Sequence, residues 1–290
     1  MKVDPECASC LLHRGYLEIA RATSDEALQF KAVQALLRMI ATDFGPHAVP
    51  AYLGTERDRL IRRITGNPDP YLDARRRANE LALRSLPVAR RFVESSRDGR
   101  ERLRRLCLVS IVANTIELDV IGHEFDLASL SRMFEQERLV LDHTDRLHDK
   151  LLSCKKVLFL ADNAGEIALD TLLVAGIKEL GPSVTVVVKG KPVIDDALLD
   201  DALQVGMDEV ADRLITTGTD TVGLIIREAS PELIEELMSC DLVVAKGMGN
   251  YETLTEERIG RPIAYLLRAK CNPVARSIGV AKESNVAILL

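Results

Sequence analysis

The sequence predicts an α/β protein. We expect an N-terminal helical domain, residues 1–150, packed on a C-terminal three-layer Rossmann-like α/β/α domain, residues 151–290, with a mostly parallel sheet. Two observations lead to this prediction. Helical periodicity continues from Pro5 to about Lys150 without a convincing strand. Beyond that point, short runs of valine, leucine and isoleucine alternate with helical segments, as is typical of strands buried on both faces of a parallel sheet.

Capping and breaking residues separate the helices of the first half. Thr23-Ser24-Asp25 supplies N-cap side chains, and Gly45-Pro46 closes the helix that follows. A glycine and two prolines within residues 66–70 favour a turn. The expected helices span residues 7–21, 25–44, 71–95 and about 100–120, and a further helical segment ends near residue 66.

The helix expected over residues 100–120 is the most apolar of this half, yet it contains Asn114 and Glu117. These two residues are three positions apart, so they share one helix face. They can make structural hydrogen bonds within the core, or both can contact a substrate in a common cavity.

Six apolar runs are the candidate strands of the second half. They cover residues 157–161, 184–188, 213–216, 242–245, 263–266 and 286–289, with helices near 166–180, 197–210 and 231–239. Ligands of open α/β sheets bind outside the carboxyl ends of the strands. Polar residues in the turns after these strands are therefore candidates for one common site.

The turn after the first of these strands gives the strongest signal. Asp162-Asn163-Ala164-Gly165-Glu166 lies between an apolar strand and a helix, and the N-terminus of a helix attracts anions. Asp162 and Glu166 are themselves negative, so a bound phosphate would be repelled unless a cation intervenes. A divalent metal ion with oxygen ligands from Asp162 and the Asn163 amide meets this requirement.

Two further turns carry lysines, glycines or aspartates. One includes Lys189, Lys191 and Asp195-Asp196, and the other runs from Lys246 to Glu252. Lysines offset phosphate charge, and glycines let backbone N–H groups approach a ligand. Taken singly, an Asp-Asp pair is more often a helix N-cap, Lys-Gly-x-Gly is more often a loop, and the two lysines can be surface residues. Their joint placement at one sheet edge favours a site.

Composition excludes several classes of protein. The chain has 290 residues, is 47% hydrophobic and carries a formal net charge of -6, which argues against nucleic acid as the main partner. The locally basic run over 59–105 is interpreted as a solvated helix face. No apolar stretch reaches the roughly 20 residues of a bilayer span, and no signal peptide is recognisable, so we expect a cytoplasmic protein without membrane association.

Four motifs make the chain resemble a known family. They are Asp162-Asn163-Ala164-Gly165-Glu166, Lys191-Pro192-Val193-Ile194-Asp195-Asp196-Ala197, Lys246-Gly247-Met248-Gly249-Asn250 and Leu267-Arg268-Ala269-Lys270-Cys271. Together they resemble the metal-dependent damage-control phosphatase family, a former domain of unknown function. The prokaryotic branch of that family also shows patterns that match Pro5-Glu6-Cys7 with Cys10, Asp69-Pro70-Tyr71 and Asn114-Thr115-Ile116. The resemblance spans nearly the whole chain.

The resemblance implies a ligand set. A divalent cation (Mg²⁺, Mn²⁺, Co²⁺ or Ni²⁺) would be bound by Asp162, Asn163 and Asp196. Phosphate would be bound by Lys270 and by a loop whose members are Lys246, Gly247, Gly249 and Asn250. The family commonly has Asn-Asp where this chain has Asp195-Asp196, so the ligand role is assigned to Asp196, with Asp195 as a possible substitute.

The function expected from these features is hydrolysis of a phosphate monoester of a small metabolite, such as a sugar phosphate or a damaged phosphorylated intermediate. Lys246 and Lys270 would offset charge on the phosphoryl oxygens, and Glu166 would act as a general base or orient the attacking water. The nucleophile is either water or Asp162. Two alternatives stay open: a carboxyl methyltransferase, which the lack of a G-x-G-x-x-G motif after the first strand disfavours, and a non-catalytic metabolite sensor.

The cysteines are interpreted separately from this site. Six cysteines in a chain of this length are expected to be thiols. Cys7 and Cys10 are spaced for a redox pair or for half of a metal site, but packed thiols are the favoured interpretation.

Overall fold

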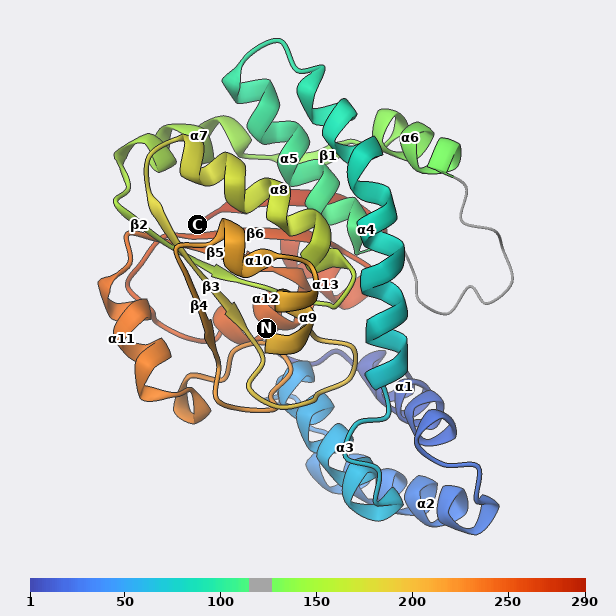
Figure 1. Ribbon diagram of the computed structural model, residues 1–290. Coiled ribbons are helices and arrows are strands. Elements are labelled where there is room, and N and C mark those ends of the chain that lie inside the picture. Colours follow the sequence, from blue (N-terminus) through green and yellow to red (C-terminus); the bar gives the residue numbers. More distant parts are fainter. Residues whose placement is uncertain (115–126) are drawn as a thin grey trace.

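The computed structural model describes residues 1–114 and 127–290 and contains a seven-stranded sheet between layers of helices (Figure 1). The strands are β1 (Leu139–Asp142), β2 (Lys156–Leu160), β3 (Ser183–Val188), β4 (Arg213–Thr216), β5 (Leu242–Lys246), β6 (Ile263–Arg268) and β7 (Asn285–Leu289). Their order in the sheet is β1-β7-β6-β5-β2-β3-β4. All neighbouring pairs are parallel except β6 with β7. The predicted fold class and mostly parallel sheet are confirmed.

The expectation of a strand-free segment up to residue 150 was wrong at β1. Leu139–Asp142 has only four residues, too few to show a period, and it becomes a strand by pairing with β7 at the edge of the sheet. Its conformation therefore depends on a contact with residues more than 140 positions away in the sequence.

Most helices agree with their expected positions. Their bounds are α1 (Cys7–Ala22), α2 (Glu26–Asp43), α3 (Pro50–Thr65), α4 (Leu72–Glu94), α5 (Gly99–Ala113), α6 (Leu127–Gln136), α7 (Thr144–Ser153), α8 (Glu166–Glu179), α9 (Leu199–Gln204), α10 (Met207–Val210), α11 (Pro231–Ser239), α12 (Gly247–Leu254) and α13 (Asn272–Ile278). The Asp25 carboxylate accepts hydrogen bonds from the first free N–H groups of α2, and Asp98 does the same for α5. Helix α5 ends at Ala113, and Glu117 lies outside the described residues.

The core explains the layers. Along β2, Val157 and Phe159 face a cluster that includes residues of α5 and α8, whereas Leu158 and Leu160 face a cluster with α11, α12 and α13. A third, smaller cluster of Ile19, Ala22, Ala32, Leu36 and Ile61 joins α1, α2 and α3. Figure 1 shows these three helices together at one end of the molecule, with α4 leading from them alongside α8.

The helices before residue 150 thus belong to two groups. Helices α1, α2 and α3 have a core of their own. Residues of α4, α5 and α7, in contrast, share one core with strands β2 and β3, so this core crosses the expected boundary at residue 150.

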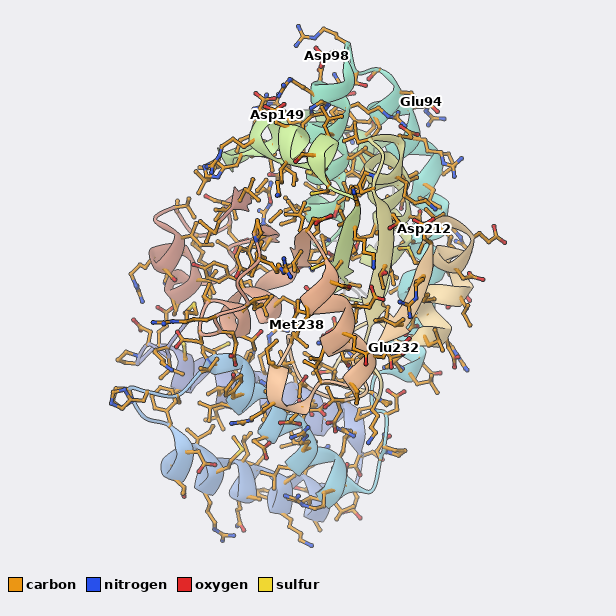
Figure 2. All side chains as sticks on the ribbon, turned by 90° about the vertical axis from the view of Figure 1, so that its left-hand side faces the viewer. Glu94, Asp98, Asp149, Asp212, Glu232 and Met238 are labelled. Atoms are coloured by element: carbon orange, nitrogen blue, oxygen red, sulfur yellow. The ribbon has the colours of Figure 1, made fainter. Side chains whose placement is uncertain are left out.

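Arginines of the basic run pair with carboxylates. Arg100 contacts Asp149, which Figure 2 shows near Asp98 at one end of the molecule, and Arg75 is buried between Asp69 and Asp201. Arg100 agrees with the interpretation of the run as a solvated helix face, whereas Arg75 does not, because its side chain is buried. Within the described ranges, no helix combines the length and hydropathy that a bilayer crossing requires.

Strand β2 is the point where the sheet topology reverses. From β2 the chain proceeds to β3 and β4 on one side, and then returns to form β5 on the other side of β2. The turns after β2 and β5 therefore leave the sheet side by side. Such a switch point is where open α/β sheets form their ligand crevice.

The approach of α4 to the N-terminus of α8 gives a first prediction. Gly165 has φ 79°, and a Cβ at this position would lie 2.9 Å from Ala78 Cβ. Gly165→Ala should therefore lower the free energy of unfolding by about 1–3 kcal/mol, measured by urea denaturation. Gly45→Ala is the matched control, because no atom lies within 4 Å of its added Cβ, and it should change stability by less than about 0.5 kcal/mol. Equal urea midpoints for the two variants would contradict the described contact.

Candidate functional site

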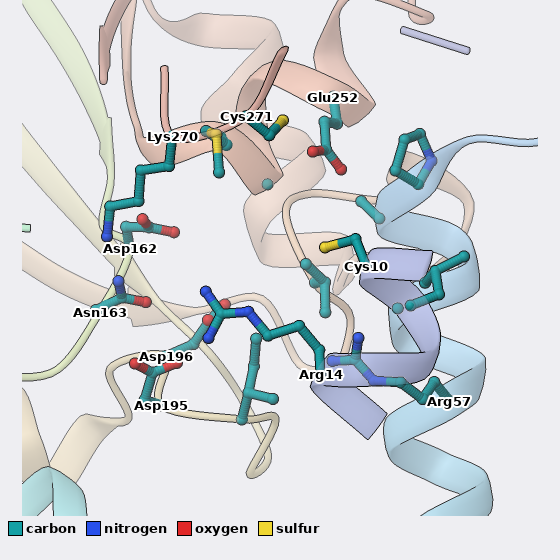
Figure 3. Close-up of a pocket in the computed structure, with 18 of the residues that line it drawn as sticks. Cys10, Arg14, Arg57, Asp162, Asn163, Asp195, Asp196, Glu252, Lys270 and Cys271 are labelled. Atoms are coloured by element: carbon teal, nitrogen blue, oxygen red, sulfur yellow. The ribbon is translucent and has the colours of Figure 1, made fainter. Parts of the chain in front are cut away.

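A cavity of about 360 Å³ lies between the carboxyl edge of the sheet and helices α1 and α3 (Figure 3). One side of it is polar and contains Asp162, Asn163, Asp196, Lys270 and Asn114. These residues come from four separate segments of the chain: the turns after β2, β3 and β6, and the end of α5. The predicted convergence of the strand-end turns is therefore present in the structure.

Backbone hydrogen bonds lock two of these turns together. Asn163 and Asp196 form an isolated antiparallel bridge. The Ala197 N–H donates to the Asp162 carbonyl oxygen at 2.8 Å, and the Ala164 N–H donates to the Asp195 carbonyl oxygen at 2.9 Å. The two aspartates expected to share a cation are thus held in a common geometry by main-chain contacts.

The turn after β5 packs directly on Asp162. Gly247 has φ 76°, a backbone conformation that favours glycine, and a Cβ built on it would overlap the Asp162 carboxylate. Only glycine therefore permits this approach between the β5 turn and the acid of the β2 turn. Gly249 of the same turn lines the cavity.

Ile194 is strained, and two helices hold it. Its φ of 37° is unusual for a β-branched residue, and such strain persists only where surrounding contacts determine the conformation. The Asp58 carboxylate of α3 accepts from the Ile194 N–H at 3.3 Å, and Arg75 of α4 donates to the Ile194 carbonyl oxygen at 3.4 Å. Helices α3 and α4 therefore help to position the Asp195-Asp196 pair that follows.

The polar side of the cavity carries excess negative charge. Burial, together with the nearby carboxylates of Glu166 and Asp196, raises the pKa of Asp162 well above its usual value. Burial also raises the pKa of Asp196 to about 7, although the Lys189 ammonium lies 3.3 Å from its Oδ2. That Oδ2 atom is buried and has no hydrogen-bond partner among the described residues. An additional cation would offset this repulsion.

These donors fit a hard divalent cation. Magnesium commonly uses one or two protein carboxylates and completes its octahedral shell with water and substrate phosphate oxygens. Asp162, Asn163 and Asp196 offer two carboxylates and an amide oxygen on the same side of one cavity. Within residues 1–114 and 127–290, no three His, Cys, Asp or Glu side chains converge as a metal-binding group. The coordination shell of the cation would therefore be completed by water and by substrate phosphate oxygens.

Lys246 occupies a different place from the one expected. Its ammonium is fully buried, forms ion pairs with Glu166 and with Asp170 Oδ1 at 3.0 Å, and is absent from the cavity lining. The Ser110 hydroxyl also donates to Asp170, at 2.6 Å. The structure therefore disagrees with direct contact between Lys246 and a phosphate, because the Lys246 ammonium is already paired with two carboxylates on one face of α8.

Asn114 connects this buried group to the cavity. Its Nδ2 donates to Asp162 Oδ2 at 3.0 Å and also to Glu166 Oε2. The Lys270 ammonium donates to the Asn114 carbonyl oxygen at 2.6 Å. Asn114 therefore orients Asp162 and Lys270, both of which line the cavity. It also links Asp162 to Glu166, the residue that is paired with Lys246.

Other expected substrate ligands lie away from the cavity. Lys191 is exposed and does not line it, whereas Lys189 is buried beside Asp196. Asn250 is buried and donates to the carbonyl oxygens of Ala161 and Lys246, at 3.3 and 2.8 Å, so it ties the ends of β2 and β5 together.

Cys7 is buried, as packed thiols would be, but Cys10 is exposed, and both line the cavity. Sequence reasoning missed Asp170, although its spacing of four residues from Glu166 in an apolar helix was a usable signal. It also missed Arg14 and Arg57 in the opposite wall, for which the sequence offers no comparable local signal.

The chain is similar to proteins of one known family over nearly its whole length. The model of the damage-control phosphatase ARMT1-like domain matches residues 3–286. A damage-control phosphatase of Archaeoglobus fulgidus is 42% identical over 290 residues, covering 99% of both chains. A damage-control phosphatase of Pyrococcus horikoshii is 28% identical and covers 99% of this chain and 98% of the relative. The crystal structure of a DUF89 family protein from Pyrococcus horikoshii matches with a TM-score of 0.89 at 28% identity, covering 99% of both chains.

The buried position of Lys246 gives a second prediction. Lys246→Met should leave Glu166 and Asp170 buried without their counter-ion and lower the free energy of unfolding by about 3–5 kcal/mol. Urea denaturation in a chelator measures this loss independently of activity. Lys282→Met is the control, since its ammonium is exposed, and it should cost less than about 0.5 kcal/mol. If both variants are as stable as the wild type, the buried ion pairs do not exist in solution.

Proposed function

This chain belongs to the damage-control phosphatase ARMT1-like family, and from this premise we propose that it hydrolyses phosphate monoesters of small metabolites with the help of a bound divalent cation. The observation that carries the proposal is the locked pair of turns after β2 and β3. It brings Asp162, Asn163 and Asp196 to one side of a cavity that also contains Lys270.

Asp162, Asn163 and Asp196 would hold the cation, which supplies electrophilic activation of a phosphoryl oxygen when bound. The buried Oδ2 of Asp196 supports this role, since it lacks a hydrogen-bond partner among the described residues and has only the Lys189 ammonium, 3.3 Å away, as a counter-charge. Asn114 already fixes Asp162 Oδ2 through a hydrogen bond. The other carboxylate oxygen of Asp162 would bind the cation or attack phosphorus.

On this side of the cavity, Lys270 is the positively charged side chain best placed to contact the substrate. It lines the cavity, and its hydrogen bond to the Asn114 carbonyl oxygen sets the direction of its side chain. Its ammonium would offset charge on the phosphoryl oxygens, a form of electrostatic stabilisation that commonly contributes several kcal/mol to the rate. Lys246 would act only by positioning Glu166, and Glu166 would position Asn114 and Asp162 in turn.

The third prediction tests metal dependence. Chelation should abolish phosphate release from a panel of phosphorylated metabolites, and Mg²⁺, Mn²⁺, Co²⁺ or Ni²⁺ should restore it. Asp162→Asn should lower kcat/KM on the order of 10²-fold or more, because one change affects both the cation and any nucleophilic role. Asp196→Asn keeps the size of the side chain and should mainly weaken metal binding, measured by calorimetry. A hydroxylamine-sensitive phosphoenzyme would identify Asp162, rather than water, as the nucleophile.

Results of other kinds would favour other functions. Turnover that survives both chelation and Asp162→Asn would eliminate the proposed mechanism. A folded, metal-loaded protein that binds phosphorylated metabolites and releases no phosphate would be a sensor. Methyl transfer to carboxyl side chains from a supplied donor, without phosphate release, would favour the methyltransferase alternative.

The fourth prediction separates phosphate binding from metal binding. Lys270→Met should lower kcat/KM on the order of 10²-fold, because the phosphoryl oxygens lose one positive charge. Its metal affinity should stay close to that of the wild type, since Lys270 is not among the expected metal ligands. Lys282→Met again serves as the control and should retain wild-type kinetics. Unchanged kinetics in Lys270→Met would remove this residue from the site.

A further inference from the structure

The wall opposite the proposed metal ligands carries positive charge. Helix α1 contributes Arg14 and helix α3 contributes Arg57 to the cavity lining. Arg14 is exposed and has no hydrogen bond or ion pair within the part of the chain that the structure describes. Figure 3 shows its side chain extended from α1 across the cavity toward the side that carries Asp195 and Asp196. A guanidinium held at a cavity wall without a partner is available to a ligand.

Close packing of α1 on α3 places Arg57 beside Arg14. A Cβ at Gly15 would lie 3.1 Å from Arg57 Cδ, so the arginine crosses α1 at the residue that follows Arg14. The whole side chain of Arg57 is buried, and among the described residues only its Nε donates a hydrogen bond, to Glu18 Oε2 at 3.1 Å. Both guanidinium groups therefore belong to one wall.

Arg57 forms a buried ion pair with Glu18 through its Nε atom only. Glu18 is fully buried, and this burial raises its pKa to about 8. Glu18 Oε1 is buried without a hydrogen-bond partner among the described residues, and the neighbouring Asp58 carboxylate raises the pKa of Glu18 further. Asp58 in turn is paired with Arg62 at 2.7 Å. The two terminal nitrogens of the Arg57 guanidinium, in contrast, donate to no described residue, so they are available to a ligand in the cavity that Arg57 lines.

We propose that Arg14 and Arg57 bind a second anionic group of the substrate, a carboxylate or a second phosphate, while the phosphate to be removed lies at the opposite side. This inference rests on the proposed function and names its substrate class: phosphate monoesters that carry another negative group. Guanidinium groups suit this task because their planar donors match the oxygens of carboxylate and phosphate. The cavity volume lies within the range of small-molecule sites, so one metabolite can contact both walls.

Two other roles for Arg14 would each have a distinct consequence. Arg14 could contact the phosphate that is removed, in which case its loss would impair all phosphate monoesters equally. It could also serve only as a counter-charge for Asp195, which lines the same cavity. In that case its loss would not change the preference between substrates.

The fifth prediction uses matched substrates that differ only in one carboxylate. The pairs are 3-phosphoglycerate with glycerol 3-phosphate, and 6-phosphogluconate with sorbitol 6-phosphate, each compared by kcat/KM. The wild type should prefer the carboxylate-bearing member at least tenfold. Arg14→Ala should lose most of this preference through a higher KM for that member, with less than a threefold change for its partner. Arg14→Lys should restore part of it, and Arg90→Ala, at an exposed position of α4, should behave as the wild type.

Binding supplies a readout that does not require turnover. Saturation-transfer NMR in a chelator should detect 6-phosphogluconate on the wild type more strongly than on Arg14→Ala. Phosphate release from both members of each pair at equal rates, or equal losses for both members in Arg14→Ala, would overturn the inference and leave the proposed function standing. Release from neither member with any metal would instead count against the proposed function, and the binding comparison would then decide the arginine site alone.

Discussion

The geometry of the candidate site depends on the contact between the turns after β2 and β3. Two main-chain hydrogen bonds join Asp162 to Ala197 and Ala164 to Asp195, so neither turn can move without the other. This arrangement forces Asp162 and Asp196 toward one another in a partly buried cavity, where their charges repel. Positively charged side chains packed around these turns offset part of this repulsion.

Two lysines act beneath the cavity rather than inside it. Lys189 lies against Asp196, and Lys246 is held by Glu166 and Asp170. Burying a lysine is costly unless it is paired, and here each one has at least one carboxylate partner. The Lys246 group also reaches Asn114 through Glu166, and Asn114 contacts both Asp162 and Lys270.

The N-terminal helices complete the cavity from the other side. Helix α3 reaches the site through Asp58, which binds the strained Ile194 turn, and helix α1 supplies Arg14. The small α1–α3 core is separate from the cores of the sheet, so these helices form a distinct wall that faces the turns proposed to bind the metal. In such an arrangement the sheet edge would carry the chemistry, and the helices would contact the remainder of the substrate.

The sequence by itself determined the parallel α/β architecture and the meeting of the Asp162 and Asp196 turns. Apolar runs mark buried strands, and parallel strands bring their carboxyl ends to one edge. Only the tertiary structure decided that Leu139–Asp142 is a strand, because four residues carry no periodicity and depend on pairing with β7. It also decided that Lys246 is buried while Lys270 reaches the cavity, and that Arg14 and Arg57 share a wall. Local patterns predict which residues occupy a turn or a helix, but the direction and the partners of a long charged side chain depend on packing between segments that are distant in sequence.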